Sequence, residues 1–378
     1  MSASRHLLAV SLVAVVSLTA LAKDYHVVDV VGDSISAGVN PECEGYGWVN
    51  MLFGESAGGN AAKTNTIFTL WPGITAWNSA VTGSTASDWA SDWAGCLTAV
   101  KNHHPDLVVV FIGGNDMMAC LENDGVFSSA EQAAYRADLS AIVTRLQSNS
   151  PKPDIIMVNY YDLFDGYSAN LSGDFAVYQN MSQAAILGNQ IIKEVALSNR
   201  CYRVDGIYDS FMHHCYGLWM GDTGHLSPGY VQLPGFDIHP VTAGHNNIYD
   251  LLYDKMNYLS EYAVPEWWLA QYGLTSDPGD LVLDQDHDGA RVWEEYAAGT
   301  CPTNSASVFK VSGSPASSPK GFALRWSAVT DRSYSVLWST NLLEGFQILT
   351  SECSGNAYTD TLHQAEARIF YKMTVTPK

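Results

Sequence analysis

Short apolar runs alternate with longer amphipathic stretches through the first two-thirds of the chain. Apolar runs of about four to eight residues are typical of buried strands, whereas apolar residues at three-to-four spacing indicate helices with one buried face. Strands that alternate with helices predict an α/β fold, in which helices cover both faces of a parallel sheet. The predicted strands are 26–31, 76–81, 107–112, 155–159 and 202–204, and the predicted helices are 130–147, 184–198 and 241–262.

The pattern changes beyond Pro265. A short helix is predicted over 266–272, and an acidic segment follows it as far as Glu295. From Phe309 onward, short strands separated by turns indicate a small all-β sandwich, and the Ser-, Pro- and Gly-rich stretch 312–321 is interpreted as a loop or linker. The predicted strands of this part are 322–326, 334–338, 346–349 and 369–375.

The N-terminus has the features of a secretory signal peptide. Arg5 and His6 precede an apolar stretch over 7–18, and Ala20-Leu21-Ala22 has the A-x-A form of a cleavage site. The apolar stretch is too short to span a bilayer comfortably, although a retained membrane anchor is the alternative. We therefore expect a secreted, extracellular or periplasmic bacterial protein, with a signal peptide over 1–22, an α/β domain over 23–263, a helical linker over 264–307 and a β-sandwich over 308–378.

Charge and cysteine content narrow the range of partners. The sequence has 39 Asp or Glu and 19 Lys or Arg residues, a net charge of −20, which disfavours nucleic acid and anionic membranes as partners. Export would place the seven cysteines in a compartment where disulfides form. Plausible local pairs are Cys201–Cys215 and Cys301–Cys353, but the sequence does not determine the connectivity, and the odd total leaves at least one thiol unpaired within the chain.

Candidate catalytic groups follow the first three predicted strands. Ser34 comes after the first strand in Gly-Asp-Ser, Gly83 after the second, and Asn115 after the third in Gly-Gly-Asn-Asp. Functional groups gather at the carboxyl ends of the strands in such sheets. A serine hydroxyl needs a base to take its proton and donors to stabilise the oxyanion. His239, just before the last predicted helix, could be that base, and the Gly83 N–H and the Asn115 amide could be donors.

These four segments, in this order, resemble the characteristic blocks of the SGNH (GDSL-like) hydrolase superfamily, over roughly residues 24–262. The resemblance implies a three-layer, flavodoxin-like parallel sheet. It also implies that Ser34 is the nucleophile and His239 the general base. The implied oxyanion hole consists of the N–H groups of Ser34 and Gly83 and the side chain of Asn115.

The acidic partner of the histidine departs from the pattern of this superfamily. The acid usually stands three residues before the histidine, and Phe236 occupies that position here. Asp237, two residues before His239, could orient the imidazole, or a backbone carbonyl near Phe236 could do so. His245 lies within the last predicted helix, and we interpret it as a helix-face histidine rather than a base.

A second motif lies in the acidic segment. Residues 284–295 match the pattern D-x-D-x-D-G-x5-E, in which alternating carboxylates converge on a hard cation and the final glutamate can bind through both oxygens. The stretch also resembles calcium-binding segments of secreted bacterial enzymes, and the alternative is an acidic linker with a chance pattern. We predict a structural Ca²⁺ held by Asp284, Asp286, Asp288, Ala290 and Glu295.

Together these features predict a secreted serine esterase that acts by acyl transfer to Ser34 and then to water, without a catalytic cofactor. Export, an acidic surface and an appended β-domain favour a carbohydrate O-acetylesterase acting on polysaccharide. The alternatives are a short-chain lipid or aryl esterase of the lysophospholipase kind, and a non-catalytic carbohydrate-binding or adhesion protein. Aromatic residues near the active edge could stack on sugars: Trp71, Trp77, Trp89, Trp93, Tyr160, Tyr161, Tyr216 and Trp219.

Overall fold

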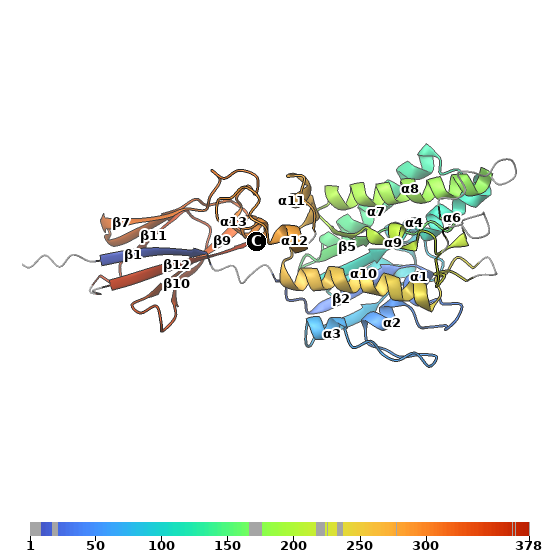
Figure 1. Cartoon of the computed structure of the whole chain (residues 1–378), viewed down its shortest axis with the longest axis horizontal. Helices are drawn as coiled ribbons and strands as arrows, with labels where there is room; N and C mark the ends of the chain where they lie inside the picture. Colours follow the sequence, from blue (N-terminus) through green and yellow to red (C-terminus); the bar gives the residue numbers. More distant parts are fainter. Residues whose placement is uncertain are drawn as a thin grey trace, which may run out of the picture. The chain divides into compact units, whose positions relative to one another are not determined.

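The computed structural model describes residues 9–16, 22–165, 176–216, 224, 226–232, 237–276, 278–364, 366 and 368–377. The chain divides into two compact units (Figure 1). The α/β unit comprises Asp24–Ser260 and Pro265–Trp267, and the C-terminal unit comprises Met1–Lys23, Glu261–Val264 and Trp268–Lys378. Each unit has its own β-structure, and the elements of the two units are therefore described separately.

A five-stranded sheet forms the centre of the α/β unit, and all of its neighbouring strands are parallel. Every residue of the central strand β4 is buried, because a parallel sheet covered on both faces leaves no strand face to water. The prediction of an α/β fold with a parallel sheet is confirmed. The strand order is β3 (Thr75–Asn78), β2 (Val27–Gly32), β4 (Leu107–Phe111), β5 (Asp154–Val158) and β6 (Tyr202–Val204).

Three long helices of this unit correspond to the predicted amphipathic stretches: α7 (Ser129–Gln147), α8 (Ala176–Ser198) and α10 (Thr242–Glu261). Figure 1 shows α7 and α8 running together along one side of the sheet. Helix α8 begins at Ala176, eight residues before the predicted start at residue 184. Shorter helices complete the unit: α1 (Ser34–Ala37), α2 (Trp48–Leu52), α3 (Ile67–Leu70), α4 (Ala86–Ser91), η1 (Trp93–Gly95), α5 (Cys96–Asn102), α6 (Gly114–Met118), η2 (Ala119–Asn123) and α9 (Gly206–Phe211).

The C-terminal unit contains two sheets whose side chains share one core. One sheet has the order β1 (Ala9–Val16), β12 (Arg368–Pro377), β9 (Arg332–Ser339) and β10 (Gln347–Cys353), and the other has β11 (Ala357–Asp360), β8 (Lys320–Trp326) and β7 (Val311–Ser317). The short helices α11 (Glu266–Ala270), α12 (Pro278–Leu281) and α13 (Val292–Ala298) precede these strands in sequence. The buried core residues are Leu324, Trp326, Tyr334, Val336, Ile369, Tyr371, Met373 and Val375.

The stretch 312–321, which the sequence analysis interprets as a loop, is mostly strand. Residues Val311–Ser317 form β7 and pair antiparallel with β8, so that interpretation is wrong. Strand β7 lies at the edge of its sheet. An edge position tolerates proline because one side of the strand needs no hydrogen-bond donor, which explains how Pro315 fits opposite Phe322.

The predicted disulfides are also wrong. All seven cysteines are free thiols in the structure, including those of the predicted pairs Cys201–Cys215 and Cys301–Cys353. Cys215 Sγ instead contacts the carbonyl oxygen of Phe211 in the preceding helical turn, 3.7 Å away. Closeness along the chain therefore did not bring these sulfur atoms together.

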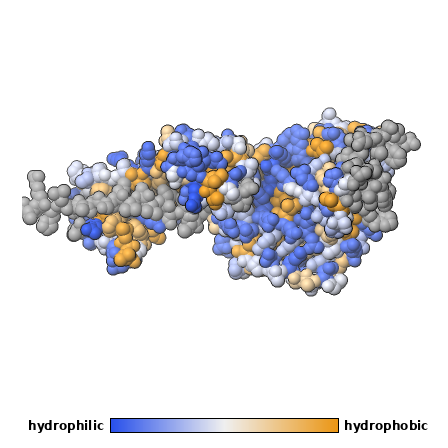
Figure 2. All heavy atoms as spheres, in the orientation of Figure 1, coloured by the Kyte–Doolittle hydropathy of each residue, from blue (hydrophilic) through white to orange (hydrophobic). Residues whose placement is uncertain are grey.

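The apolar segment near the N-terminus forms β1, parallel to β12, with Ala9 opposite Arg368. The prediction that residues 1–22 are a signal peptide concerns the processed chain and stays a prediction. No helix within the described ranges is long and apolar enough to cross a membrane. Figure 2 shows a surface of mainly hydrophilic residues on the α/β unit, and a hydrophobic area near the β9–β10 turn, where Leu342, Leu343 and Ile348 are exposed.

His245 connects helix α10 to the segment that follows α1. Its side chain is fully buried, its Nε2 lies 3.1 Å from the Val39 carbonyl oxygen, and its Nδ1 lies 3.3 Å from the Trp48 backbone nitrogen. The neutral tautomer with a proton on Nε2 satisfies both contacts, since Nε2–H donates to Val39 and Nδ1 accepts from Trp48. Burial lowers the pKa of His245 from 6.5 to about 4.

We expect this burial to make the α/β unit less stable in weak acid. Between pH 6.5 and about 4 the unfolded chain binds a proton at position 245 that the folded chain does not, so stability falls with pH by roughly 3 kcal/mol across that window. His245→Gln removes the titration. Urea unfolding of both proteins should show their difference in free energy of unfolding changing by about this amount between pH 7.5 and pH 4. An identical pH dependence in the two proteins would contradict the assignment.

Candidate active site

Ser34 is the first residue of α1, directly after β2. The Asp33 side chain caps this short helix, since its Oδ1 accepts the Ile35 N–H at 3.0 Å. Gly32 is needed at the end of the strand because a Cβ there would lie 2.4 Å from Ser36 Oγ and 3.0 Å from the Phe111 carbonyl oxygen. The buried strand and the tight turn therefore fix the position of the Ser34 hydroxyl.

The structure brings Ser34, His239 and Asp237 together. His239 Nε2 lies 2.9 Å from Ser34 Oγ, and His239 Nδ1 lies 2.6 Å from Asp237 Oδ1. With the proton of the imidazole on Nδ1 and directed at the carboxylate, Nε2 is free to accept the serine proton. This is the hydrogen-bonded arrangement that activates a serine for attack on a carbonyl group.

Asp237 can contact the imidazole from only two residues away because its side chain turns back towards the backbone of its own segment. Asp237 Oδ1 also accepts the backbone N–H of His239 at 3.0 Å, which is the pattern of an Asx-turn. One carboxylate oxygen thus contacts both the backbone and the ring of the same histidine. Phe236, whose carbonyl was the alternative partner, lies outside the described residues.

Two buried tyrosines hold the segment that contains His239. Tyr161 Oη donates to the Ile238 carbonyl oxygen at 2.6 Å, and Tyr216 Oη donates to the Asp237 carbonyl oxygen at 2.7 Å. Because both donors are buried in the α/β unit, they restrict the movement of the backbone between Asp237 and His239. The sequence analysis did not identify this positioning role.

Asn115 and Asp116 fix the segment after Gly83. Asn115 Nδ2 donates to the Ser84 carbonyl oxygen at 2.8 Å, and the Asp116 carboxylate accepts the Ala86 N–H at 2.9 Å. One of the two N–H bonds of the Asn115 amide remains for another acceptor. Within the described part of the chain, the backbone N–H groups of Ser34 and Gly83 have no assigned acceptor.

Two acidic side chains next to these groups have raised pKa values. Burial raises the pKa of Asp33 to about 6, although the hydrogen bond from Tyr160 Oη, at 2.7 Å, opposes this shift. Burial likewise raises the pKa of Asp116 to about 6. Sequence reasoning missed both side chains, and their positions directly before Ser34 and directly after Asn115 are the signal that could have identified them.

A small apolar cavity of about 50 Å³ adjoins Ser34 and Asn115. Its volume suits a group of a few heavy atoms, because one water needs about 10–15 Å³ on this measure. The apolar side chains that line it are Ile35, Met117, Met118, Leu163, Phe164, Met181, Ala185 and Ile238.

The aromatic residues proposed to stack on sugars lie in different surroundings in the structure. Trp77 and Trp93 are exposed, at 44% and 57%, but neither lines this cavity. Trp219 lies outside the described residues. The remaining five are buried: Trp71, Trp89, Tyr160, Tyr161 and Tyr216. Of these five, Tyr160 and Tyr161 line the cavity beside Ser34.

The chain matches the GDSL-like Lipase/Acylhydrolase family over residues 30–246, which is more than half of its 378 residues. Comparison with curated proteins found no match. Among solved structures it is similar to Axe2, an acetylxylan esterase from Geobacillus stearothermophilus, with 19% identity and a TM-score of 0.43 over 62% of this chain and 95% of that chain. LAE5, an α/β hydrolase from the metagenome of Lake Arreo in Spain, gives 19% identity and a TM-score of 0.41 over 62% of this chain and 96% of that chain.

The contact between Asp237 and His239 predicts that Asp237→Asn slows the reaction of Ser34 with a fluorophosphonate reagent. An asparagine can no longer hold the imidazole as the tautomer that accepts the serine proton, so we expect a decrease in labelling rate of about 10³–10⁴-fold. Asp209→Asn, an exposed aspartate of α9, is the matched control. Equal labelling rates in the two variants would show that another group orients the histidine.

Proposed function

Because the chain belongs to the GDSL-like lipase/acylhydrolase family, we propose that it hydrolyses carboxylic esters through an acyl-enzyme formed on Ser34. The observation that supports this most directly is the pair of hydrogen bonds from Asp237 to His239 and from His239 to Ser34, 2.6 and 2.9 Å long. These two hydrogen bonds are the arrangement that lets a serine hydroxyl transfer its proton to the histidine as it attacks a carbonyl carbon.

The first half of the reaction forms the acyl-enzyme. Ser34 Oγ attacks the ester carbonyl carbon while His239 Nε2 takes the hydroxyl proton, and the carbonyl oxygen becomes an oxyanion. The N–H groups of Ser34 and Gly83 and the remaining N–H of Asn115 stabilise that oxyanion. When the intermediate collapses, the carbon–oxygen bond to the alcohol breaks and the His239 proton passes to the departing alcohol oxygen.

The second half repeats the sequence with water as the nucleophile. His239 takes a proton from the water, the hydroxide attacks the acyl carbon, and the bond to Ser34 Oγ breaks as the proton returns to that oxygen. The products are the free acid and the original enzyme. Every proton is transferred by His239, so the chain needs no catalytic cofactor for these steps.

We propose an O-acetylated polysaccharide as the substrate, with the acetyl methyl group in the cavity beside Ser34. The small volume and apolar lining of that cavity support a short acyl group. The net charge of −20 favours a substrate other than an anionic lipid surface. The same apolar lining also fits a short-chain lipid or aryl ester, which is the second candidate.

We also propose that the protein is exported and that its first 22 residues are removed, as the sequence analysis expects. Cleavage would remove β1, which pairs with β12. Strand β12 would then be an edge strand of its sheet, next to β9.

Replacement of the nucleophile tests the proposed reaction. Ser34→Ala should lower the rate of p-nitrophenyl acetate hydrolysis by 10⁴-fold or more, because the acyl-enzyme no longer forms. Ser36→Ala is the matched control, since this hydroxyl is also buried but has no hydrogen-bond partner in the described structure. Similar rates for the native protein and Ser34→Ala would instead favour a non-catalytic binding protein.

The cavity predicts a limit on acyl-chain length. In a series of p-nitrophenyl esters, kcat/KM should fall once the acyl group exceeds about four carbons, and Met117→Ala should raise the rate with longer esters about tenfold relative to acetate. Leu121→Ala, a substitution at an exposed residue, is the control and should leave the preference unchanged. Release of acetate from acetylated xylan supports the polysaccharide proposal. Failure to release it, with rapid cleavage of longer esters, would favour the lipid alternative.

A further inference from the structure

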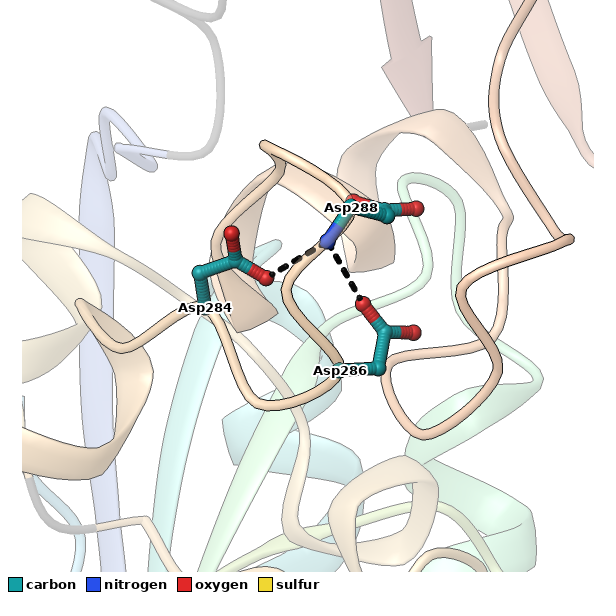
Figure 3. Close-up of side chains that lie close together, drawn as sticks. All are labelled: Asp284, Asp286 and Asp288. Atoms are coloured by element: carbon teal, nitrogen blue, oxygen red, sulfur yellow. Dashed lines mark hydrogen bonds between the residues drawn. The ribbon is translucent and has the colours of Figure 1, made fainter.

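Three aspartates of the C-terminal unit lie together on one tight loop. Within the described residues, Asp284, Asp286 and Asp288 each offer a carboxylate oxygen, and these oxygens lie within 4.8 Å of one another. Figure 3 shows their side chains around a single turn of the backbone, where the Asp288 N–H donates to Asp284 Oδ1 and to Asp286 Oδ1. The Val292 N–H donates to the Leu283 carbonyl oxygen at 3.0 Å and so closes the two ends of the loop.

Several buried oxygens of this loop lack a partner. Asp286 Oδ2, Asp288 Oδ2 and Glu295 Oε2 are inaccessible to water and have no hydrogen-bond partner in the described part of the structure. The Glu295 side chain is completely buried, and buried carboxylates are normally paired or coordinated to a metal. Among the described residues, no protein group therefore pairs with Oε2 of this buried carboxylate.

We infer that this loop binds a calcium ion. One oxygen of each aspartate, the Ala290 carbonyl oxygen and both oxygens of Glu295 would supply six ligands, within the six to eight oxygens that Ca²⁺ takes. The ion would give partners to the three buried oxygens and offset the repulsion among the four carboxylates. The inference depends on residues of the C-terminal unit alone and not on the proposed ester hydrolysis.

The loop favours calcium over magnesium. Gly289, at φ +100°, occupies the sixth position of the loop, where a sharp turn is needed. Glu295 lies in the first turn of α13, so both of its oxygens can approach the ion from one direction. A two-oxygen glutamate suits the flexible coordination of Ca²⁺, whereas Mg²⁺ demands near-ideal octahedral geometry and retains its waters. Val292 at the ninth position has no polar side chain, which leaves one coordination place for water.

The site would also stabilise the contact between α13 and the β-structure of the same unit. Arg332, the first residue of β9, is buried, and its Nε donates to the Ala297 carbonyl oxygen at 2.8 Å. Another guanidinium nitrogen of Arg332 donates to the Tyr296 carbonyl oxygen. Glu295, Tyr296 and Ala297 are consecutive, so an ion that fixes Glu295 fixes the helical turn against which Arg332 is held.

Metal binding is tested first on the full-length protein after treatment with chelator. Titration with Tb³⁺ should give luminescence sensitised by Trp293, which lies within the loop, and added Ca²⁺ should displace the Tb³⁺ with a Kd below about 1 mM. Magnesium should displace it far less effectively. Absence of sensitised emission together with absence of calcium binding by calorimetry would overturn the inference.

Thermal unfolding of matched variants locates the site. Saturating Ca²⁺ should raise the melting temperature of the C-terminal unit by on the order of 10 °C, and chelator should reverse the shift. Glu295→Gln and Asp284→Asn should both lose the shift. Glu294→Gln should keep it, because Glu294 instead accepts the Arg291 N–H. An undiminished shift in both loop variants would place the calcium elsewhere. The rate of p-nitrophenyl acetate hydrolysis at 25 °C should not respond to Ca²⁺, which separates this result from a failure of the proposed function.

Discussion

The hydrogen bond between His239 and Ser34 is the contact on which the proposed chemistry of the α/β unit depends. It is 2.9 Å long and joins residues 205 positions apart in the sequence. Strand β2 fixes one partner because it pairs with β3 on one side and with the fully buried strand β4 on the other. The other partner lies in an irregular segment, where side chains supplement the isolated backbone bridge between Val231 and Pro240.

Those side chains come from the carboxyl end of β5 and from the region after α9. Tyr161 and Tyr216 donate to consecutive carbonyl oxygens at Ile238 and Asp237, and Tyr160 donates to Asp33 beside the nucleophile. Tyr160 and Tyr161, which follow β5, therefore hold the segments on the two sides of the hydrogen bond between Ser34 and His239. Buried phenol groups suit this role because they provide one directed donor on a rigid ring. The aromatic residues next to the site therefore help to position the catalytic groups.

The sequence allowed prediction of features that local patterns determine. Apolar runs such as 107–112 identify buried strands, and the groups after the first three strands meet because parallel strands share one carboxyl edge. The sequence analysis did not predict features that depend on contacts between residues far apart in the sequence. Strand β7 contains Pro315 and acquires its conformation only by pairing with β8. The tyrosine hydroxyls have hydrogen-bond partners more than 20 residues away in the sequence. The cysteines that were proposed as pairs contact other residues instead of one another. The role of Asp237 as the partner of His239 was only a hypothesis, because the turn of its side chain back to its own segment is visible only in the folded structure.

The positions of Ser34 and His239 in the sequence also determine when, during synthesis, the proposed catalytic groups can meet. The serine is near the beginning of this unit and the histidine lies just before its last long helix, α10. A growing chain therefore has a hydroxyl without a base until almost the whole unit has left the ribosome and packed. The proposed reaction therefore requires that almost the whole unit has been synthesised and folded.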